Sequence, residues 1–382
     1  MMGVYEELGV KRYINAHDTY TVYGGSRMAA ESLDAMREAA ESFVDIEELQ
    51  VRAGDAIARM THNEAAYITN GASGGVLLAA CVCMTGGDPF RFSRLPDTTR
   101  CRNEIVIMRC QRNAYDMAIT ASGATVVEIG DADETLPWEL EGVLGERTAA
   151  VFYFASSLYA KAAMKLEDVI RMAHARNIPV VVDAAAQLPP AENLWRFTRM
   201  GADMVLFSGG KTLCGPQASG LIVGTVEMIA RCRALGAPVH GICRSSKVGR
   251  EEMAALYVAV KQYVSLDHGK HHARLESIVK RLMDVMHDTG AFHVQMLDHG
   301  PVGQTYPRAH GRIIANFTAD ELAQSMRMLD PGIYIGVDRD APNAVYLSPL
   351  NLSDEEVEMV AEALKTTVAH LLSPQPQEGS CP

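Results

Sequence analysis

Short apolar runs alternate with stretches of helical spacing through the middle of the chain. We expect seven strands there, with the bounds Ala65–Thr69, Ile105–Arg109, Thr125–Ile129, Ala149–Phe154, Pro179–Asp183, Asp203–Phe207 and Gly220–Gly224. The runs around Val151, Val181 and Val205 are almost continuously apolar, which is typical of strands that helices cover on both faces. Strands alternating with helices predict an α/β fold with a mostly parallel sheet.

The pattern changes beyond Gly236. Apolar residues fall at helical spacing from Glu251 and again from Leu275, and a final helix is expected from about Asp354 to Leu372. We therefore expect an N-terminal arm and helix (residues 1–50), a large domain (51–235) and a smaller α/β C-terminal domain (236–382). The last ten residues, SPQPQEGSCP, are predicted to be a disordered tail.

Charge and composition narrow the classes of partner. The formal net charge of the 382-residue chain is −12, which argues against nucleic acid because its binders need a basic face. No apolar run is long enough to cross a bilayer, and the first residues lack the pattern of a signal peptide. The eight cysteines are scattered without a CxxC pair, so we expect reduced thiols. These features predict a cytoplasmic protein that binds neither nucleic acid nor a membrane.

One histidine cluster, formed by His268, His271 and His272, has spacings that could bind a metal on a helix. The alternative is a solvated helix surface, which we favour, and we expect no metal.

Residues capable of chemistry follow three of the expected strands, where ligands bind in open α/β sheets. Lys211 follows an apolar strand and two glycines, and Asp183 ends the run Val180–Val182. The small residues of Asn70–Gly75 join a strand to a helix, and such a turn offers backbone N–H groups to a phosphate. A phosphate nest, a carboxylate for a ring nitrogen and a lysine for an aldehyde are what pyridoxal 5'-phosphate (PLP) requires.

Each of these features has another interpretation. Asp183 could be a helix cap or a turn residue, and the turn at Asn70–Gly75 could be only a tight connection. The Gly-Lys-Thr sequence around Lys211 also suggests a P-loop. A P-loop needs a glycine where Val205 stands inside the expected strand, which argues against a nucleotide site.

Further stretches of the chain match one family in order. They are Tyr13–Ala16, Gly24–Met28, Ala65–Gly75, Leu95–Thr99, Val182–Ala185 and Phe207–Gly220. The last is the most specific, because Gly-Pro-Gln follows the lysine loop. In these stretches the chain resembles the PLP enzymes related to bacterial selenocysteine synthase, especially their D-glucosaminate-6-phosphate ammonia-lyase branch. The resemblance runs from about Arg12 to Ala255 and continues more weakly to the end.

The resemblance implies the fold of the PLP-dependent transferases (aspartate aminotransferase, fold type I). It implies that Lys211 is the Schiff-base lysine and that Asp183 pairs with the pyridinium nitrogen. The remaining implied cofactor residues are Gly71, Ala72 and Ser73 at the phosphate, Ser208 beside it, and Gln111 near the ring. Arg27 matches an arginine expected to face the substrate, and Arg112 lies beside Gln111. A surface ion pair is the alternative for Arg27.

The chain departs from the family pattern at two places. His17 and Asp18 stand where relatives usually carry small residues, so the substrate here could differ, and His17 could act as an acid or form part of a turn. A late strand carries Tyr346 where many enzymes of this fold have the arginine that binds the substrate carboxylate. The arginines that could take that role are Arg308, Arg312 and Arg339.

The resemblance also implies a neighbouring subunit. His240–Arg250 resembles a family stretch near the active site, and its Arg244 and Lys247 could face the site of a second copy in a homodimer. The tRNA-handling extension of selenocysteine synthase is not expected, because the chain begins almost at the Ile-Asn-Ala motif.

We therefore predict a PLP-dependent lyase that eliminates ammonia from a hydroxy-amino acid or amino-sugar acid and gives a 2-oxo acid. Lys211, once freed by the substrate amine, would remove the α-proton, and a β-hydroxyl would leave. The alternatives are an aminotransferase, a racemase or an aldolase on a small amino acid. A selenocysteine synthase-type transferase and a non-catalytic PLP-binding protein also stay open.

Overall fold

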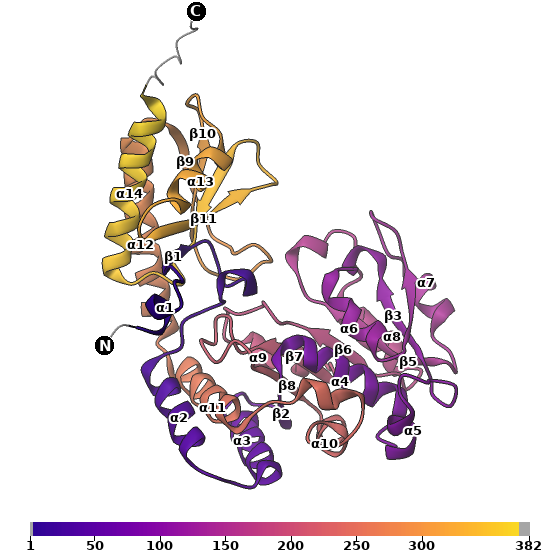
Figure 1. Ribbon diagram of the computed structural model, residues 1–382. Helices are drawn as coiled ribbons and strands as arrows, with labels where there is room; N and C mark the ends of the chain where they lie inside the picture. The colour runs from indigo at the N-terminus through magenta and orange to yellow at the C-terminus, as the bar shows by residue number, and fades with distance from the viewer. Residues whose placement is uncertain (1–2, 374–382) are drawn as a thin grey trace, which may run out of the picture. The chain divides into compact units, whose positions relative to one another are not determined.

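The structure, a computed structural model, describes residues 3–373. The described chain divides into two compact units (Figure 1). Unit 1 contains the residues up to Gly25, Asp267–Gly300 and those from Thr305 onward, and unit 2 contains Ser26–Leu266 with Pro301–Gln304. Each unit is described by itself below.

Unit 2 is built on a seven-stranded sheet. Its strands, in spatial order, are β2 (Ala65–Thr69), β8 (Gly220–Gly224), β7 (Met204–Ser208), β6 (Val180–Asp183), β5 (Thr148–Phe154), β3 (Glu104–Met108) and β4 (Thr125–Ile129). Strands β7, β6, β5, β3 and β4 pair in parallel, and β8 is antiparallel to both β7 and β2. The seven predicted strands all form, each within one residue of its expected ends, and the mostly parallel sheet is confirmed.

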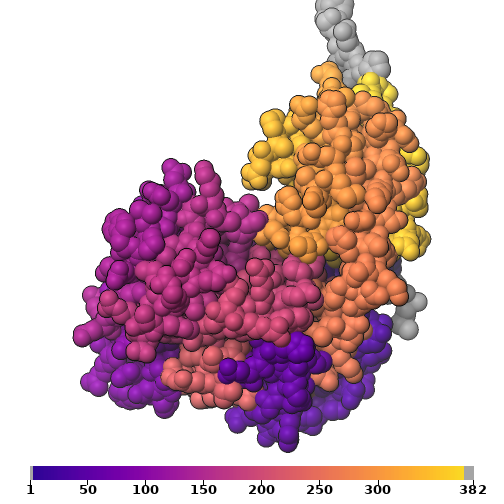
Figure 2. All heavy atoms as spheres, turned by 180° about the vertical axis from the view of Figure 1, so that it is seen from behind, coloured from indigo at the N-terminus to yellow at the C-terminus, as the bar shows by residue number. Residues whose placement is uncertain are grey.

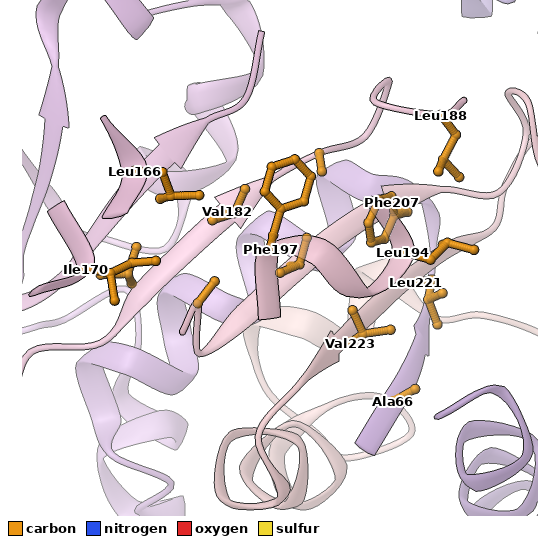
Figure 3. Packing of buried hydrophobic residues seen from close by; sticks show 14 of the residues in the cluster. Ala66, Leu166, Ile170, Val182, Leu188, Leu194, Phe197, Phe207, Leu221 and Val223 are labelled. Atoms are coloured by element: carbon orange, nitrogen blue, oxygen red, sulfur yellow. The ribbon is translucent and has the colours of Figure 1, made fainter. Parts of the chain in front are cut away.

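Helices cover both faces of this sheet, as the continuous apolar strands predict. The helices of unit 2 are α2 (Ala30–Glu41), α3 (Ile46–Met60), α4 (Gly71–Thr85), α5 (Pro89–Arg94), α6 (Met117–Ala121), α7 (Pro137–Val143), α8 (Leu166–His174), α9 (Asn193–Arg199), α10 (Val226–Leu235) and α11 (Arg250–Ser265). Successive strand residues point to opposite faces, so Val182 and Phe207 enter one apolar core while Val181 enters the other. Figure 3 shows Val182 and Phe207 packed near Leu194 and Phe197 of α9.

Unit 1 is a second, smaller α/β layer. Its five-stranded sheet has the order β1 (Tyr13–Ala16), β11 (Gly332–Asp338), β12 (Ala344–Leu347), β10 (Arg308–Ile313) and β9 (Phe292–Leu297). The helices of this unit are α1 (Val4–Glu7), α12 (His268–Asp288), α13 (Ala319–Arg327) and α14 (Asp354–Leu372). The last three share one apolar core with alternate residues of the strands. Side chains of the other strand positions therefore lie on the opposite face of the sheet, away from this core.

The structure differs from the predicted domain boundaries at two places, the N-terminal arm and the start of the smaller domain. The expected arm (residues 1–50) divides, because β1 pairs in parallel with β11 in unit 1 while α2 and α3 belong to unit 2. The expected boundary near residue 236 lies at Leu266 instead, because α11 packs against α2 and α3. Apolar spacing identified these segments as strand and helices, but pairing between segments so distant in the chain leaves no local signal.

Two remaining expectations concern the surface and the end of the chain. None of the helices in residues 3–373 combines the length and apolar character needed to span a bilayer. The predicted disordered tail, apart from Ser373, lies outside the described residues. His268, His271 and His272 fall in the first turns of α12, and within the described range no three metal-ligating side chains are arranged so that they could hold a metal ion.

Candidate active site

Candidate residues for cofactor binding gather at one edge of the unit 2 sheet. Asp183 is the last residue of β6, Ser208 is the last residue of β7, and Lys211 follows three positions later. Strand β2 runs in the same direction as β7, because each is antiparallel to β8. The turn after β2 therefore emerges at the same edge as Asp183 and Lys211, which is where ligands bind in open α/β sheets.

The turn after β2 has the form of an anion nest. Gly71 begins the fifteen-residue helix α4 with a φ of +63°, and no side chain in the described part of the chain caps the first backbone N–H groups of the helix. The first turn of α4 also contains no acidic residue. Gly220 of β8 packs so closely that a Cβ there would lie 2.4 Å from the carbonyl group of Gly71. Gly71, Ala72 and Ser73 thus present free backbone donors and the positive end of a helix dipole.

The loop that carries Lys211 is held by hydrogen bonds to its backbone. The carbonyl oxygen of Lys211 accepts from the Ser26 hydroxyl at 2.6 Å, and the Ser26 N–H donates to Gly210 at 3.0 Å. Both glycines before the lysine are required by close packing. A Cβ on Gly209 would lie 2.0 Å from the Ser219 hydroxyl oxygen, and one on Gly210 would lie 2.6 Å from backbone. The side chain of Lys211 is half-buried. Ser26 lies in the stretch Gly24–Met28 that resembles the family, but its contact with the lysine loop has no local signal.

Burial disfavours the charged form of the Asp183 carboxyl, and a nearby cation would stabilise it. Burial raises the pKa of the Asp183 carboxyl, whereas the hydrogen bond from the N–H of Ala185 and the charge of Lys211 lower it in part. The Ala185 N–H donates to Oδ1 at 2.9 Å, and within the described residues no hydrogen bond reaches Oδ2. A protonated ring nitrogen at Oδ2 would balance the charge, so this carboxyl fits PLP.

Gln111 supplies an unused donor at the same edge. Its side chain is fully buried just after β3, and its Oε1 accepts the Phe154 N–H at 3.1 Å. Phe154 is paired in register with Asp183 across β5 and β6. The Nε2 of Gln111 is buried with no partner in the described chain. Because an unmet buried donor is costly, the site fits a bound group with an acceptor there.

Other predicted site residues of unit 2 are placed differently. Arg112 pairs with Asp116 at 2.5 Å and also with Glu128, so its guanidinium is engaged within the protein rather than directed to a substrate. Arg27 is exposed and directly follows Ser26. Arg244 is exposed on η5 (Ile242–Ser246), and Lys247 is exposed just after it.

Ser246, which was not among the expected site residues, packs against Gly74 in the first turn of α4. Ser246, the last residue of η5, has its Cβ 3.4 Å from where a Cβ on Gly74 would lie. A hydroxyl at that position is suited to an anion at the start of α4. Ser246 lies within the stretch His240–Arg250 that resembles the family, but no local pattern singles it out, because η5 and α4 are brought together only by tertiary packing.

The remaining predicted residues belong to unit 1. His17 is half-buried after β1, and Arg308 is buried at the start of β10. Arg312 and Arg339 are exposed, Arg312 on β10 and Arg339 in the loop after β11. Only Arg308 among these three arginines is thus enclosed by protein.

A parallel sheet with a lysine, a carboxylate and an anion nest at one edge defines the fold type I class of PLP-dependent enzymes. A solved D-glucosaminate-6-phosphate ammonia-lyase has this fold with a TM-score of 0.84 and 29% identity, over 97% of this chain and 99% of that chain. Serine palmitoyltransferase from Sphingomonas wittichii, at 14% identity and a TM-score of 0.58 over 94% of this chain and 88% of its own, shares the fold.

The chain belongs to the SelA family, described as L-seryl-tRNA selenium transferase, whose family model matches residues 20–296. D-glucosaminate-6-phosphate ammonia lyase from Salmonella typhimurium (strain 14028s / SGSC 2262) is 30% identical, over 96% of this chain and 98% of its own length. A 5'-C-glycyluridine monooxygenase-decarboxylase from Streptomyces sp is 31% identical over 94% of this chain and 91% of its own. The family resemblance expected from the motifs is confirmed.

Proposed function

We propose that this protein is a PLP-dependent ammonia-lyase that acts on a hydroxy-amino acid or an amino-sugar acid and gives a 2-oxo acid. The observation that carries the proposal is the lysine, carboxylate and anion nest at one sheet edge, in a chain of which 96% is similar to D-glucosaminate-6-phosphate ammonia lyase. PLP, when bound, supplies an electron sink for the charge left by removal of an α-proton.

The residues of unit 2 have distinct parts in this proposal. The start of α4 binds the phosphate through the N–H groups of Gly71, Ala72 and Ser73, with Ser208 beside it. Asp183 keeps the ring nitrogen protonated, and Gln111 donates from Nε2. Lys211 binds the cofactor aldehyde and, after the substrate amine displaces it, moves the α-proton. The Ser26 hydroxyl orients the Lys211 backbone for this transfer.

An assay with candidate substrates distinguishes elimination of ammonia from the alternative reactions. Incubation with D-glucosaminate 6-phosphate and with 2-amino-3-hydroxy acids is expected to release ammonia and a 2-oxo acid in equal amounts, with or without oxygen. The Streptomyces relative makes a decarboxylating oxygenase the specific alternative. Oxygen uptake with carbon dioxide release would favour that alternative. Conversion of PLP to pyridoxamine phosphate, reversed by addition of a 2-oxo acid, would favour an aminotransferase. Inversion of the substrate α-carbon without release of ammonia would favour a racemase.

We also propose that the protein works as a homodimer in the cytoplasm. Unit 2 carries an apolar cavity of about 480 Å³ between α2, α3 and α11, and Phe43 beside it is 96% exposed. In Figure 2 the indigo spheres at the bottom of the view belong to this early part of the chain. An exposed aromatic side chain beside an apolar groove suits a second copy of the chain.

The proposed location in the cytoplasm is supported by the cysteines. The seven described cysteines are free thiols, which suits a reducing compartment.

Subunit mixing tests whether Arg244 serves a neighbour's site. Lys211→Ala and Arg244→Ala chains are each expected to be weakly active alone. Refolded together in equal amounts, they are expected to recover roughly a quarter of wild-type activity, because half of the dimers would contain one intact site. Assay of the mixture, with sedimentation to confirm dimers, is the measurement. No recovery in confirmed mixed dimers would place Arg244 outside the partner's site, and an active monomer would contradict the dimer itself.

A further inference from the structure

Arg308 is a buried cation on the face of the unit 1 sheet that the helices leave uncovered. Its neighbours Ala309 and Ile313 on β10 enter the apolar core, so Arg308 points to the other face. Only 6% of the residue is exposed, and its Nε donates to the carbonyl oxygen of His299 at 3.0 Å. An arginine this buried is almost always paired with an anion.

Two carboxylates of unit 1, Asp18 and Asp338, already have hydrogen-bond or ion-pair partners of their own. Asp18 accepts the Thr19 N–H at Oδ1 and the Tyr306 hydroxyl at Oδ2, both at 2.6 Å. Asp338 lies 3.1 Å from the imidazole of His310. Within residues 3–373, Arg308 forms no ion pair with any carboxylate. The described residues therefore bury this charge without a directly paired carboxylate, which is costly unless a ligand provides one.

The ring of Tyr346 fixes the orientation of the guanidinium. The Arg308 Cζ lies 4.7 Å from the ring centroid, in a cation–π contact. The ring has room because it packs on Gly336, where a Cβ would be 2.1 Å from the Tyr346 Cζ. A guanidinium held by its face and by Nε keeps its terminal N–H groups for a bidentate contact with a planar or tetrahedral oxyanion.

His17 lies next to this cation and senses its charge. Its Nδ1 is 3.3 Å from the Tyr346 hydroxyl, and its ring contacts Tyr23 and Tyr20 with centroids 4.3 Å and 5.5 Å away. Burial is the main cause that lowers the pKa of His17, and the charge of Arg308 lowers it further, while Asp18 acts in the opposite sense. His17 is consequently mostly neutral at pH 7 when no anion is present.

We propose that Arg308, Tyr346 and His17 form an anion subsite in unit 1 that binds a carboxylate or phosphate group of a small molecule. That this group belongs to the substrate rests on the proposed function. An anion at Arg308 offsets the positive charge that His17 senses, so binding raises the pKa of the imidazole and favours its protonation. A substrate bound in this way would itself prepare His17 to act as an acid.

The test is a nuclear magnetic resonance titration of the holoenzyme labelled with ¹³C in its histidine rings. The resonance of His17 is identified by its loss in His17→Gln. Addition of inorganic phosphate or of acetate, with ionic strength held constant by sodium chloride, is expected to raise the pKa of His17 by about one pH unit. A larger response to phosphate than to acetate assigns the subsite to a phosphate group, and the reverse assigns it to a carboxylate.

Variants on one strand make the result specific. Arg308→Gln is expected to raise the pKa of His17 without added anion and to abolish its response, whereas Arg312→Gln, at an exposed position on the same face of β10, is expected to respond as wild type. Arg308→Lys keeps the charge, so the pKa of His17 is expected to respond to anions in this variant too, but only at higher anion concentrations. This variant keeps the test valid if Arg308→Gln does not fold.

The outcomes separate the subsite from the reaction. An unchanged His17 titration with both anions, or an equal response in folded Arg308→Gln, overturns the subsite even if ammonia is released from a substrate. A normal anion response in a protein that releases no ammonia supports the subsite and contradicts only the proposed reaction.

Discussion

Lys211→Ala is expected to lose covalent cofactor and to lower turnover by roughly 10³-fold or more, because the variant has no amine to bind the PLP aldehyde or to move the α-proton. The close packing of Gly209 and Gly210 and the hydrogen bond from the Ser26 hydroxyl hold the Lys211 backbone in place. The visible absorbance of the protein-bound cofactor and the rate of ammonia release are the measurements.

The control for this change is Lys165→Ala, which removes an exposed lysine at the start of α8 in the same unit. It is expected to keep both the absorbance and the activity of the wild type. If Lys211→Ala retained the wild-type absorbance and turnover, the lysine would be a structural residue of the loop and the proposed site would be incorrect.

Asp183→Asn is expected to bind PLP but to lose about 10²-fold or more in turnover, because an amide cannot balance a protonated ring nitrogen. The same change is expected to leave the thermal midpoint of the cofactor-free protein unchanged or higher at pH 8. The folded-state pKa of Asp183 is raised, so its contribution to stability is present below the ordinary value of 3.8 and is lost as the pH rises through the folded value.

The stability gain of Asp183→Asn should therefore shrink as the pH falls toward 3.8. Asp203→Asn is the matched control. Asp203 lies just before β7, where its Oδ2 accepts the Val180 N–H at 2.8 Å and pairs with His174. That variant is expected to melt at a lower temperature and to keep its turnover. A lower midpoint with normal activity in Asp183→Asn would instead identify Asp183 as a structural turn residue.

The strands and the lysine–aspartate pair were predictable because their signals are local. Val180–Val182 is a β-branched apolar run, which packs well in a buried strand, and Asp183 and Lys211 stand at the ends of such runs. The parallel order of the sheet then brings both residues to one edge. Local sequence was sufficient for this part of the candidate site.

Other features depend on contacts between distant segments and had no local signal. Tyr13–Ala16 joins the unit 1 sheet through pairing with Gly332–Ile335, more than 300 residues away. Arg112 is adjacent to Gln111 in sequence, but the structure engages it with Asp116 and Glu128. Likewise, no pattern distinguishes the buried Arg308 from the exposed Arg312, because exposure is set by packing around β10.

The measurement that tests the account most directly is borohydride reduction of the purified holoenzyme followed by peptide mapping. Reduction fixes the cofactor on the amine that holds it, and the pyridoxyl group is expected on Lys211 alone. A pyridoxyl group on a different lysine, or none on any lysine of a protein that contains PLP, would contradict the central claim.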